Sequence, residues 1–237
     1  LLVETVYNKI WANIRKKGIE AKVRNVIKVT DMIQPESARM AAKRKAFAEI
    51  HESLGGKLNL LVSGGAPVDP NVLAGMRAFG FRVIQGYGLT ECAPLAILNH
   101  DKLHLAESVG EVIPGSEAKI LNPDEHGVGE ILLKGDMVML GYYNNPEETA
   151  KVIDEDGWFH TGDLGYVDSK GRYYISGRCK NVIVTSNGKN IYPEELEYRL
   201  NKNAFISESL VYGEKGDIIS CEILHDEQVV KAKLKKQ

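Results

Sequence analysis

The first part of the chain has apolar residues at helical spacing. Val3, Ile10 and Ile14 recur at this spacing with Lys and Arg between them, which predicts an amphipathic helix. A second helix is expected to begin after Pro35 and to end at the Gly55-Gly56 pair. The whole stretch up to these glycines is therefore predicted to be helical. A basic cluster in the second helix fits either a solvated helix face or a phosphate-binding patch, and the solvated face is favoured; its members are Arg39, Lys43, Arg44 and Lys45.

The pattern changes after the two glycines. Leu58–Val62 is a short apolar run and predicts a strand, and Phe81–Ile84 predicts another. Between them Asp69 stands before Pro70, the usual order of a helix cap and a first helical residue, and this helix is expected to end near Gly80. A strand, a helix and a strand at this spacing predict a βαβ unit with a parallel sheet covered on both faces.

A β-rich segment is expected next. Four short strands, GEVIP, EAKIL, GEILLKG and MVMLGYY, are separated by Gly, Pro and Asp between Ser108 and Tyr143, which predicts a small antiparallel, barrel-like unit. Asn145 is expected to cap a short helix. The stretches Trp158–Val167 and Arg172–Ser176 predict a hairpin.

The last part alternates between strand and helix signals from about Lys180, with a helix beginning at Pro193 and two strands before a Lys-rich helix. The predicted fold class is α/β: a partial doubly wound βαβ layer, a barrel-like antiparallel unit and a small α+β C-terminal lobe. The predicted domains are residues 1–107, the partial α/β subdomain, residues 108–179, the β-rich subdomain, and residues 180–237, a mobile lobe.

Composition excludes several classes of protein. The 237 residues are 43% hydrophobic and 26% charged with a net charge of −2, which is typical of an ordinary globular protein and gives no sign of nucleic-acid binding. No apolar run approaches a membrane span of about 18 residues. Three widely spaced cysteines (Cys92, Cys179, Cys221) indicate neither a disulfide framework nor a zinc site, so a cytoplasmic setting is expected. The chain has no initiator Met, which suggests a piece of a longer protein.

Two glycine-rich turns follow the two predicted parallel strands. They are Ser63–Pro67 and Gly86–Glu91, and such turns at neighbouring strand ends are expected to face one pocket. In the second turn the order is Gly-Tyr-Gly-Leu-Thr-Glu. Glycines allow close approach of a ligand, an aromatic ring offers a face for a base, and a hydroxyl and a carboxylate suit a phosphate and its Mg²⁺. A tight turn with Tyr87 in the core is the equal alternative.

Two further motifs have weaker signals when taken alone. The sequence GWFHTGD places Asp163 in what is interpreted as a strand-ending turn, where a carboxylate suits ribose hydroxyls. The sequence GRCKNVIVTSNGKNIYPEE places Arg178 at the boundary of the last lobe, either as a nucleotide contact or, more commonly, as a structural ion pair.

Together and in this order, SGGAP, QGYGLTE, GWFHTGD and GRCKNVIVTSNGKNIYPEE resemble the signatures of the adenylate-forming, AMP-binding superfamily. The last motif is most similar to that of the long- and medium-chain fatty acyl-CoA synthetase branch. The resemblance runs from Leu1 to at least Asp217. It implies a ligase that activates a carboxylic acid with ATP and Mg²⁺ and transfers the acyl group to CoA, so the expected partners are these small molecules.

The resemblance also implies roles for individual residues. Tyr87 would stack on adenine, Thr90 would bind the α-phosphate and Glu91 would hold Mg²⁺. Asp163 would accept the ribose hydroxyls with help from Arg178. Other residues would form the wall beside the nucleotide: Gly64, Gly65, Ala66, Pro67, Gly86 and Gly88. Lys180 matches the family's hinge, and the loop Ser186-Asn187-Gly188 would approach the pantetheine of CoA.

Two family elements are missing from the sequence, and this leaves alternatives open. No Ser/Thr/Gly-rich phosphate loop precedes Lys57, and the tail VVKAKLKKQ has no counterpart of the C-terminal catalytic lysine segment. Loss of one such charge stabiliser typically costs about 10²–10³ in rate, so the chain alone is expected to be nearly inactive. The alternatives are loading of a carrier protein instead of CoA, activation of an aryl acid, a non-catalytic adenine-nucleotide-binding module, and a scaffold that has lost the site.

Overall fold

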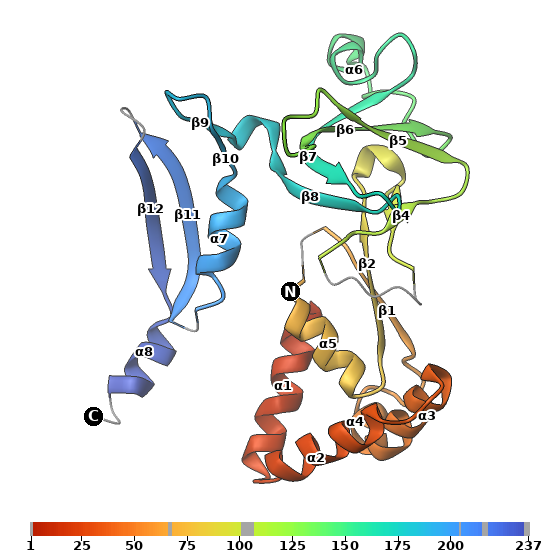
Figure 1. The fold of residues 1–237 in the computed structure, drawn as a ribbon, viewed down its shortest axis with the longest axis vertical. Helices are drawn as coiled ribbons and strands as arrows, with labels where there is room; N and C mark the ends of the chain where they lie inside the picture. Colours follow the sequence, from red (N-terminus) through yellow and green to blue (C-terminus); the bar gives the residue numbers. More distant parts are fainter. Residues whose placement is uncertain (1, 66–67, 101–106, 204, 215–217, 235–237) are drawn as a thin grey trace. The chain divides into compact units, whose positions relative to one another are not determined.

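The computed structural model describes residues 2–65, 68–100, 107–203, 205–214 and 218–234. The chain forms two compact units, each assembled from separate stretches of sequence, and Figure 1 shows their elements. The first unit comprises Leu1–Glu117, Lys134–Leu140 and Asp168–Tyr174, and the second comprises Ala118–Leu133, Gly141–Val167 and Ile175–Gln237. Within the described ranges, no helix is both long and apolar enough to cross a membrane.

The N-terminal stretch is helical, as predicted, but it is divided into four helices. They are α1 (Leu2–Lys16), α2 (Glu20–Asp31), α3 (Glu36–Ala46) and α4 (Ala48–Ser53). Gly18, with φ +68°, separates the first two, because a left-handed residue ends a helix. The expectation of a solvated basic face on α3 is wrong for two of its members. Lys43 is buried, and Arg44 donates to the carbonyl groups of Leu58 and Gly56 at 2.9 and 2.8 Å.

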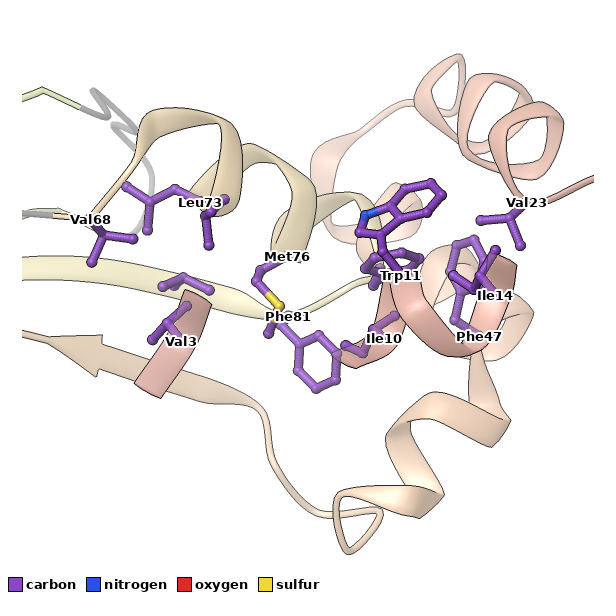
Figure 2. Packing of buried hydrophobic residues seen from close by; sticks show 13 residues of the cluster. Val3, Ile10, Trp11, Ile14, Val23, Phe47, Val68, Leu73, Met76 and Phe81 are labelled. Atoms are coloured by element: carbon purple, nitrogen blue, oxygen red, sulfur yellow. The ribbon is translucent and has the colours of Figure 1, made fainter. Parts of the chain in front are cut away.

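These helices enclose the hydrophobic core of the first unit (Figure 2). From α1, Val3, Ile10, Trp11 and Ile14 are buried, which matches the helical spacing in the sequence. Met76, on helix α5 (Pro70–Ala78), and the two aromatic residues that follow this helix, Phe79 and Phe81, are completely buried in the same cluster. The core therefore fixes α5, and through it the strands on either side of α5.

The predicted βαβ unit is confirmed. Strands β1 (Leu60–Ser63) and β2 (Arg82–Tyr87) pair in parallel, with Ser63 opposite Gln85. The Asp69 carboxylate accepts a hydrogen bond from the backbone N–H of Asn71 at 2.7 Å and so caps α5. Two short antiparallel strands continue the sheet in the order β1-β2-β3-β4; they are β3 (Ile97–Leu98) and β4 (Glu111–Val112).

The expectation that this sheet is covered on both faces is wrong at β1. Leu60 and Val62, which share one face of the strand, are 40% and 57% exposed. β1 is also an edge strand of this sheet, with no partner strand on its other side among the described residues. The core lies on the side of the sheet from which α5 packs.

A second four-stranded sheet lies largely in the second unit. Its order is β5-β6-β7-β8, from β5 (Ser116–Leu121), β6 (Gly129–Gly135), β7 (Phe159–Val167) and β8 (Tyr173–Arg178). In the described residues it is an open sheet, not a closed barrel. Helix α6 (Pro146–Val152) begins after Asn145, whose side-chain oxygen accepts a hydrogen bond from Glu148 N at 3.2 Å.

One predicted strand does not form. The stretch MVMLGYY is irregular, with Leu140 and Tyr143 fully exposed. Its backbone turns at Gly141, where φ is +149°, and Asn144, directly after the stretch, has φ +51°, so this apolar run does not continue in a ladder.

The C-terminal part has the predicted α+β character. A hairpin of β9 (Ile183–Val184) and β10 (Asn190–Ile191) precedes α7 (Pro193–Leu200). Two antiparallel strands and a helix follow; they are β11 (Ile206–Glu214), β12 (Ile218–His225) and α8 (Glu227–Leu234). The domain boundaries near residues 107 and 179 stay predictions.

Candidate functional site

The two glycine-rich turns of the first unit lie at the same edge of the sheet. Because β1 and β2 are parallel and in register, their carboxyl ends are neighbours. A Cβ added at Gly64, in the first turn, would be 3.3 Å from the carbonyl oxygen of Gly86. Gly65 has φ +82°, a conformation that other residues rarely adopt. Ala66 and Pro67, also expected at this wall, lie outside the described residues.

The glycines on either side of Tyr87 are required by close contacts with a returning segment of the chain, which the sequence did not reveal. A Cβ at Gly88 would lie 1.9 Å from the carbonyl oxygen of Pro94, and one at Gly86 would lie 2.8 Å from Leu95 Cδ1. The chain returns toward β2 at this point, since Tyr87 pairs with Ile97 in β3. The two glycines therefore allow the chain to fold back tightly beside the aromatic residue, whether or not a ligand is bound.

Tyr87, Thr90 and Glu91 are the three residues of this turn for which the sequence predicts a ligand. Tyr87 ends β2 and is half-buried, whereas Thr90 is exposed and Glu91 is half-buried in a short 3₁₀ helix, Thr90–Cys92. The carbonyl of Glu91 accepts a hydrogen bond from Met139 N at 2.7 Å, which holds the turn in place. The structure therefore keeps an aromatic face, a hydroxyl and a carboxylate within five residues on a fixed turn.

The neighbouring thiol is not available for chemistry. Cys92 is completely buried, and this burial, reinforced by the nearby Glu91 carboxylate, raises the pKa of the Cys92 thiol to about 11. A thiol with so high a pKa is protonated at neutral pH and is a poor nucleophile. The reactive groups of the turn are its oxygen atoms.

In the second unit, Asp163 is held by a bulge in β7. The expectation of a strand-ending turn is wrong, because the residue lies inside the strand. The pairing of β6 with β7 is regular up to Glu130 opposite Leu164, then shifts before Leu132 pairs with His160. Gly162 lies in the extra segment with φ +69°, which is the left-handed conformation of a glycine bulge.

Thr161 fixes the geometry of this bulge. Its hydroxyl donates to the carbonyl of Ile131 at 2.7 Å and accepts a hydrogen bond from Asp163 N at 3.0 Å. In the sequence Thr-Gly-Asp, the hydroxyl of Thr161 holds the bulge by two hydrogen bonds, Gly162 has the left-handed conformation, and Asp163 supplies the carboxylate whose position the bulge sets.

Asp163 forms an ion pair with Arg178 at the end of β8. The Arg178 Nε lies 3.0 Å from Asp163 Oδ1, while the side chains of Asp163 and Arg178 are 8% and 65% exposed. The structure therefore brings together two residues that the sequence placed fifteen positions apart. A buried carboxylate with an exposed cation beside it suits a polar ligand that approaches from solvent.

Glu130 is a residue of this site that sequence reasoning missed. Its Oε1 accepts a hydrogen bond from Gly162 N at 2.9 Å, and its Oε2 lies 3.2 Å from His160 Nδ1. His160 Nε2 in turn lies 3.7 Å from Asp154 Oδ2. The sequence signal that could have revealed Glu130 is a carboxylate inside the apolar strand GEILLKG, because a carboxylate within such a strand needs a polar partner on the next strand.

The expected hinge and CoA loop follow β8. Lys180 is exposed within the 3₁₀ turn Cys179–Asn181, and the Asn181 amide donates to Glu194 Oε1 at 2.6 Å. The loop Ser186-Asn187-Gly188 is the exposed tip of the β9–β10 hairpin, where Gly188 has φ +77°. Tyr192 OH lies 3.4 Å from Asp124 Oδ2, which joins this segment to the β5–β6 turn.

A family model described as AMP-binding enzyme matches residues 5–143. The chain belongs to this family. Among curated proteins, the peroxisomal long chain acyl-CoA synthetase 6 of Arabidopsis thaliana is 32% identical, over 90% of this chain and 33% of the relative. The long-chain-fatty-acid–CoA ligase of Salmonella typhimurium is 40% identical, over 66% of this chain and 29% of the relative. The chain thus spans about a third of the length of the relatives it matches.

Solved structures of AMP-binding enzymes have the same fold. O-succinylbenzoate coenzyme A synthetase from Bacillus subtilis, in complex with AMP, matches with a TM-score of 0.65 and 28% identity, over 76% of this chain and 40% of that one. ATP-bound MatB from Rhodopseudomonas palustris matches with a TM-score of 0.62 and 31% identity, over 71% and 35%. The mixed α/β fold predicted from the sequence is therefore that of the adenylate-forming enzymes.

Proposed function

We propose that this chain is part of an AMP-forming acyl-CoA synthetase that activates a fatty acid with ATP and transfers the acyl group to CoA. The main support is the buried Asp163 on a glycine bulge beside Arg178, in a chain that is similar over 90% of its length to a long chain acyl-CoA synthetase. A buried carboxylate that a backbone feature aims in a fixed direction is suited to accept two ribose hydroxyls.

The first unit would bind the base and the phosphates. Tyr87 offers its ring to adenine and Thr90 offers its hydroxyl to the α-phosphate. Mg²⁺ is commonly bound through one or two carboxylates together with phosphate oxygens, so Glu91 on its fixed turn suits the metal. The metal would neutralise charge on the leaving pyrophosphate.

The second unit would bind the ribose and serve the thioester step. Asp163 and Arg178 would bind the sugar, Lys180 would be the hinge of the C-terminal lobe, and the Ser186–Gly188 loop would contact the pantetheine of CoA. The exposure of Lys180 and of the hairpin tip supports these roles, because a hinge and a docking loop must be accessible.

AMP affinity of the 237-residue chain tests the nucleotide site. Tyr87→Ala and Asp163→Ala are each expected to weaken AMP binding by about 1–3 kcal/mol in calorimetry. Asp156→Ala is the matched control, since it removes an exposed carboxylate near the same strand. Equal affinity in all variants that keep the far-ultraviolet circular dichroism of the parent chain would favour the scaffold alternative.

Comparison of AMP with ATP tests what the chain does alone. The sequence has no Ser/Thr/Gly-rich phosphate loop, so the extra phosphates should add little affinity and carboxylate-dependent exchange of pyrophosphate into ATP should be slow. Rapid exchange would contradict the proposed inactivity of the isolated chain and would leave the nucleotide site intact.

A further inference from the structure

Glu194 is a carboxylate of the second unit that the proposed function does not use. It lies in the first turn of α7, and its side chain contacts the segment at the end of β8, residues 177–181. This segment contains Arg178 of the proposed ribose site and Lys180 of the proposed hinge. The segment and α7 belong to the same compact unit. A side chain that contacts this segment can therefore set the position of both residues.

The two carboxylate oxygens of Glu194 contact opposite ends of the 177–181 segment. Oε1 accepts a hydrogen bond from the side-chain amide of Asn181 at 2.6 Å. Oε2 lies against Gly177, since a Cβ added at this glycine would be 2.6 Å from it. Because one side chain contacts both ends, it restricts the residues between them, and the first of these is Arg178.

Gly177 leaves the space that this carboxylate occupies. The residue is buried in β8 and its φ is outside the left-handed range, so its backbone conformation does not by itself require a glycine. The nearest atoms to an added Cβ belong to the Glu194 carboxylate and, at 3.8 Å, to Tyr192, both at the start of α7. The close approach of α7 to β8 therefore requires a residue without a side chain at this position.

One oxygen of Glu194 gains no hydrogen bond from this placement. Oε2 is buried and, among the residues that the structure describes, has no hydrogen-bond partner. A buried acceptor without a donor lowers the stability of the fold. The placement of this carboxylate therefore points to a role in positioning the segment. A contact with this cost is also easily released, which a segment that carries the proposed hinge requires.

We propose that Glu194 is a positioning residue: its carboxylate holds the 177–181 segment against α7 and thereby keeps the Arg178 guanidinium beside Asp163. This inference rests on the proposed function, in which Asp163 and Arg178 bind ribose. The 3.0 Å ion pair between these two residues then depends on a side chain of the C-terminal lobe. The ribose site is complete only while the start of α7 lies against the end of β8.

Limited digestion of the 237-residue chain with trypsin tests this contact without a nucleotide. Trypsin cleaves after Arg178 and Lys180, which are both exposed, when the segment opens locally. Cleavage after Lys170, an exposed residue of the β7–β8 turn, is the internal reference. A variant that only destabilises the whole chain raises cleavage at all three sites, whereas loss of the Glu194 contact raises it after Arg178 and Lys180 alone.

Three variants of the first turn of α7 separate the contact from the charge. Glu194→Ala should raise cleavage in the 177–181 segment about tenfold relative to the reference site, because a hydrogen bond to a charged group is lost. Glu194→Gln keeps an oxygen that can accept from the Asn181 amide and should stay within about twofold of the parent chain. Glu195→Ala is the matched control, since it removes an exposed carboxylate from the same turn.

Gly177→Ala tests the same contact from the other side. Its methyl group would occupy the place of Oε2 and displace the Glu194 side chain, so cleavage in the segment should rise as it does in Glu194→Ala. The double variant should be cleaved no faster than either single variant, because the two changes remove one contact. If Glu194→Ala alters the circular dichroism of the chain, Gly177→Ala decides.

AMP affinity links the contact to the ribose site. Glu194→Ala should weaken AMP binding severalfold in calorimetry, and Glu194→Gln should restore most of it. If the parent chain binds no AMP, the proposed function fails for this chain, and the digestion still decides the role of Glu194. The proposal is overturned if Glu194→Ala leaves cleavage in the segment or a measurable AMP affinity unchanged, if Glu195→Ala raises cleavage equally, or if the two single effects multiply in the double variant.

Discussion

The guanidinium of Arg178 lies 3.0 Å from the carboxylate of Asp163, yet only one of the two side chains is buried. Asp163 is fixed by the bulge in β7, whereas Arg178 is the last residue of β8 and is largely in solvent. Solvent screens an ion pair of this kind and limits its contribution to folding. If Arg178 has the proposed ligand role, we expect it to contribute more to ligand binding at Asp163 than to the stability of the fold.

Replacement of Arg178 should separate these two roles. Arg178→Ala is expected to lower the free energy of unfolding by less than about 1 kcal/mol, because the Arg178 side chain lies largely in solvent. The same variant should weaken AMP binding severalfold, and Arg178→Lys should restore only part of it, since lysine lacks the Nε donor. Urea unfolding and calorimetry measure the two effects. A large loss of stability with unchanged AMP affinity would assign Arg178 a structural role only.

The bulge itself gives a second prediction. Gly162 has φ +69° with no atom within 4 Å of an added Cβ, so Gly162→Ala meets a backbone penalty without a clash. We expect a loss of about 1–2 kcal/mol in unfolding free energy, or relief of the bulge. Relief of the bulge would displace Asp163, and AMP affinity should then fall.

Gly188→Ala is the matched control for this variant. Gly188 has φ +77°, is equally free of neighbours and lies in the exposed β9–β10 turn. It should have a similar backbone cost in urea unfolding, with AMP affinity unchanged. Equal AMP affinity in both variants would show that the bulge does not aim the carboxylate at the nucleotide.

Features with a local cause were predictable from the sequence. The cap at Asp69 followed by Pro70 fixed the start of α5, and Pro193 did the same for α7. The parallel pairing of β1 and β2 followed from the helix between them. Each of these signals acts over a few residues, so a single sequence contains it.

Features that depend on distant partners were not predictable. The bulge at Gly162 exists because β7 pairs with β6, about thirty residues earlier, and Glu130 there holds Gly162 N. The ion pair of Lys43 with Asp31, at the end of α2, also depends on helix packing. Periodicity shows only that Lys43 lies on the same face of α3 as Arg39.

A third prediction concerns Gly88 beside the proposed adenine-binding residue. A Cβ there would be 1.9 Å from a carbonyl oxygen of the returning backbone, so Gly88→Ala must displace that backbone. We expect thermal unfolding at a clearly lower temperature, with a cost of about 1–3 kcal/mol, as for overpacking in a core. Gly64→Ala, where the nearest atom is 3.3 Å away, should cost less. If the two variants melt together, the crowding at Gly88 is not what requires a glycine.

The last prediction concerns the dependence of stability on pH and rests on His51. Its ring is buried and stacks on Phe81 at 4.1 Å, and Nε2 lies 2.9 Å from the carbonyl oxygen of Phe79. That contact assigns the proton to Nε2 and leaves Nδ1 without a partner among the described residues. Burial lowers the pKa of His51 below 6.5, and the nearby Arg44 acts in the same direction.

The folded chain therefore binds the His51 proton less readily than the unfolded chain. Its contribution to stability is complete above pH of about 6.5 and declines as the pH falls below that value, by at most about 1.4 kcal/mol per pH unit. Urea unfolding between pH 8 and pH 5 should show this decline, and His51→Phe should reduce it. His126→Gln, which changes a histidine whose side chain is 78% exposed, is the control and should keep the slope of the parent chain. An unchanged slope in His51→Phe would assign the acid sensitivity to other groups.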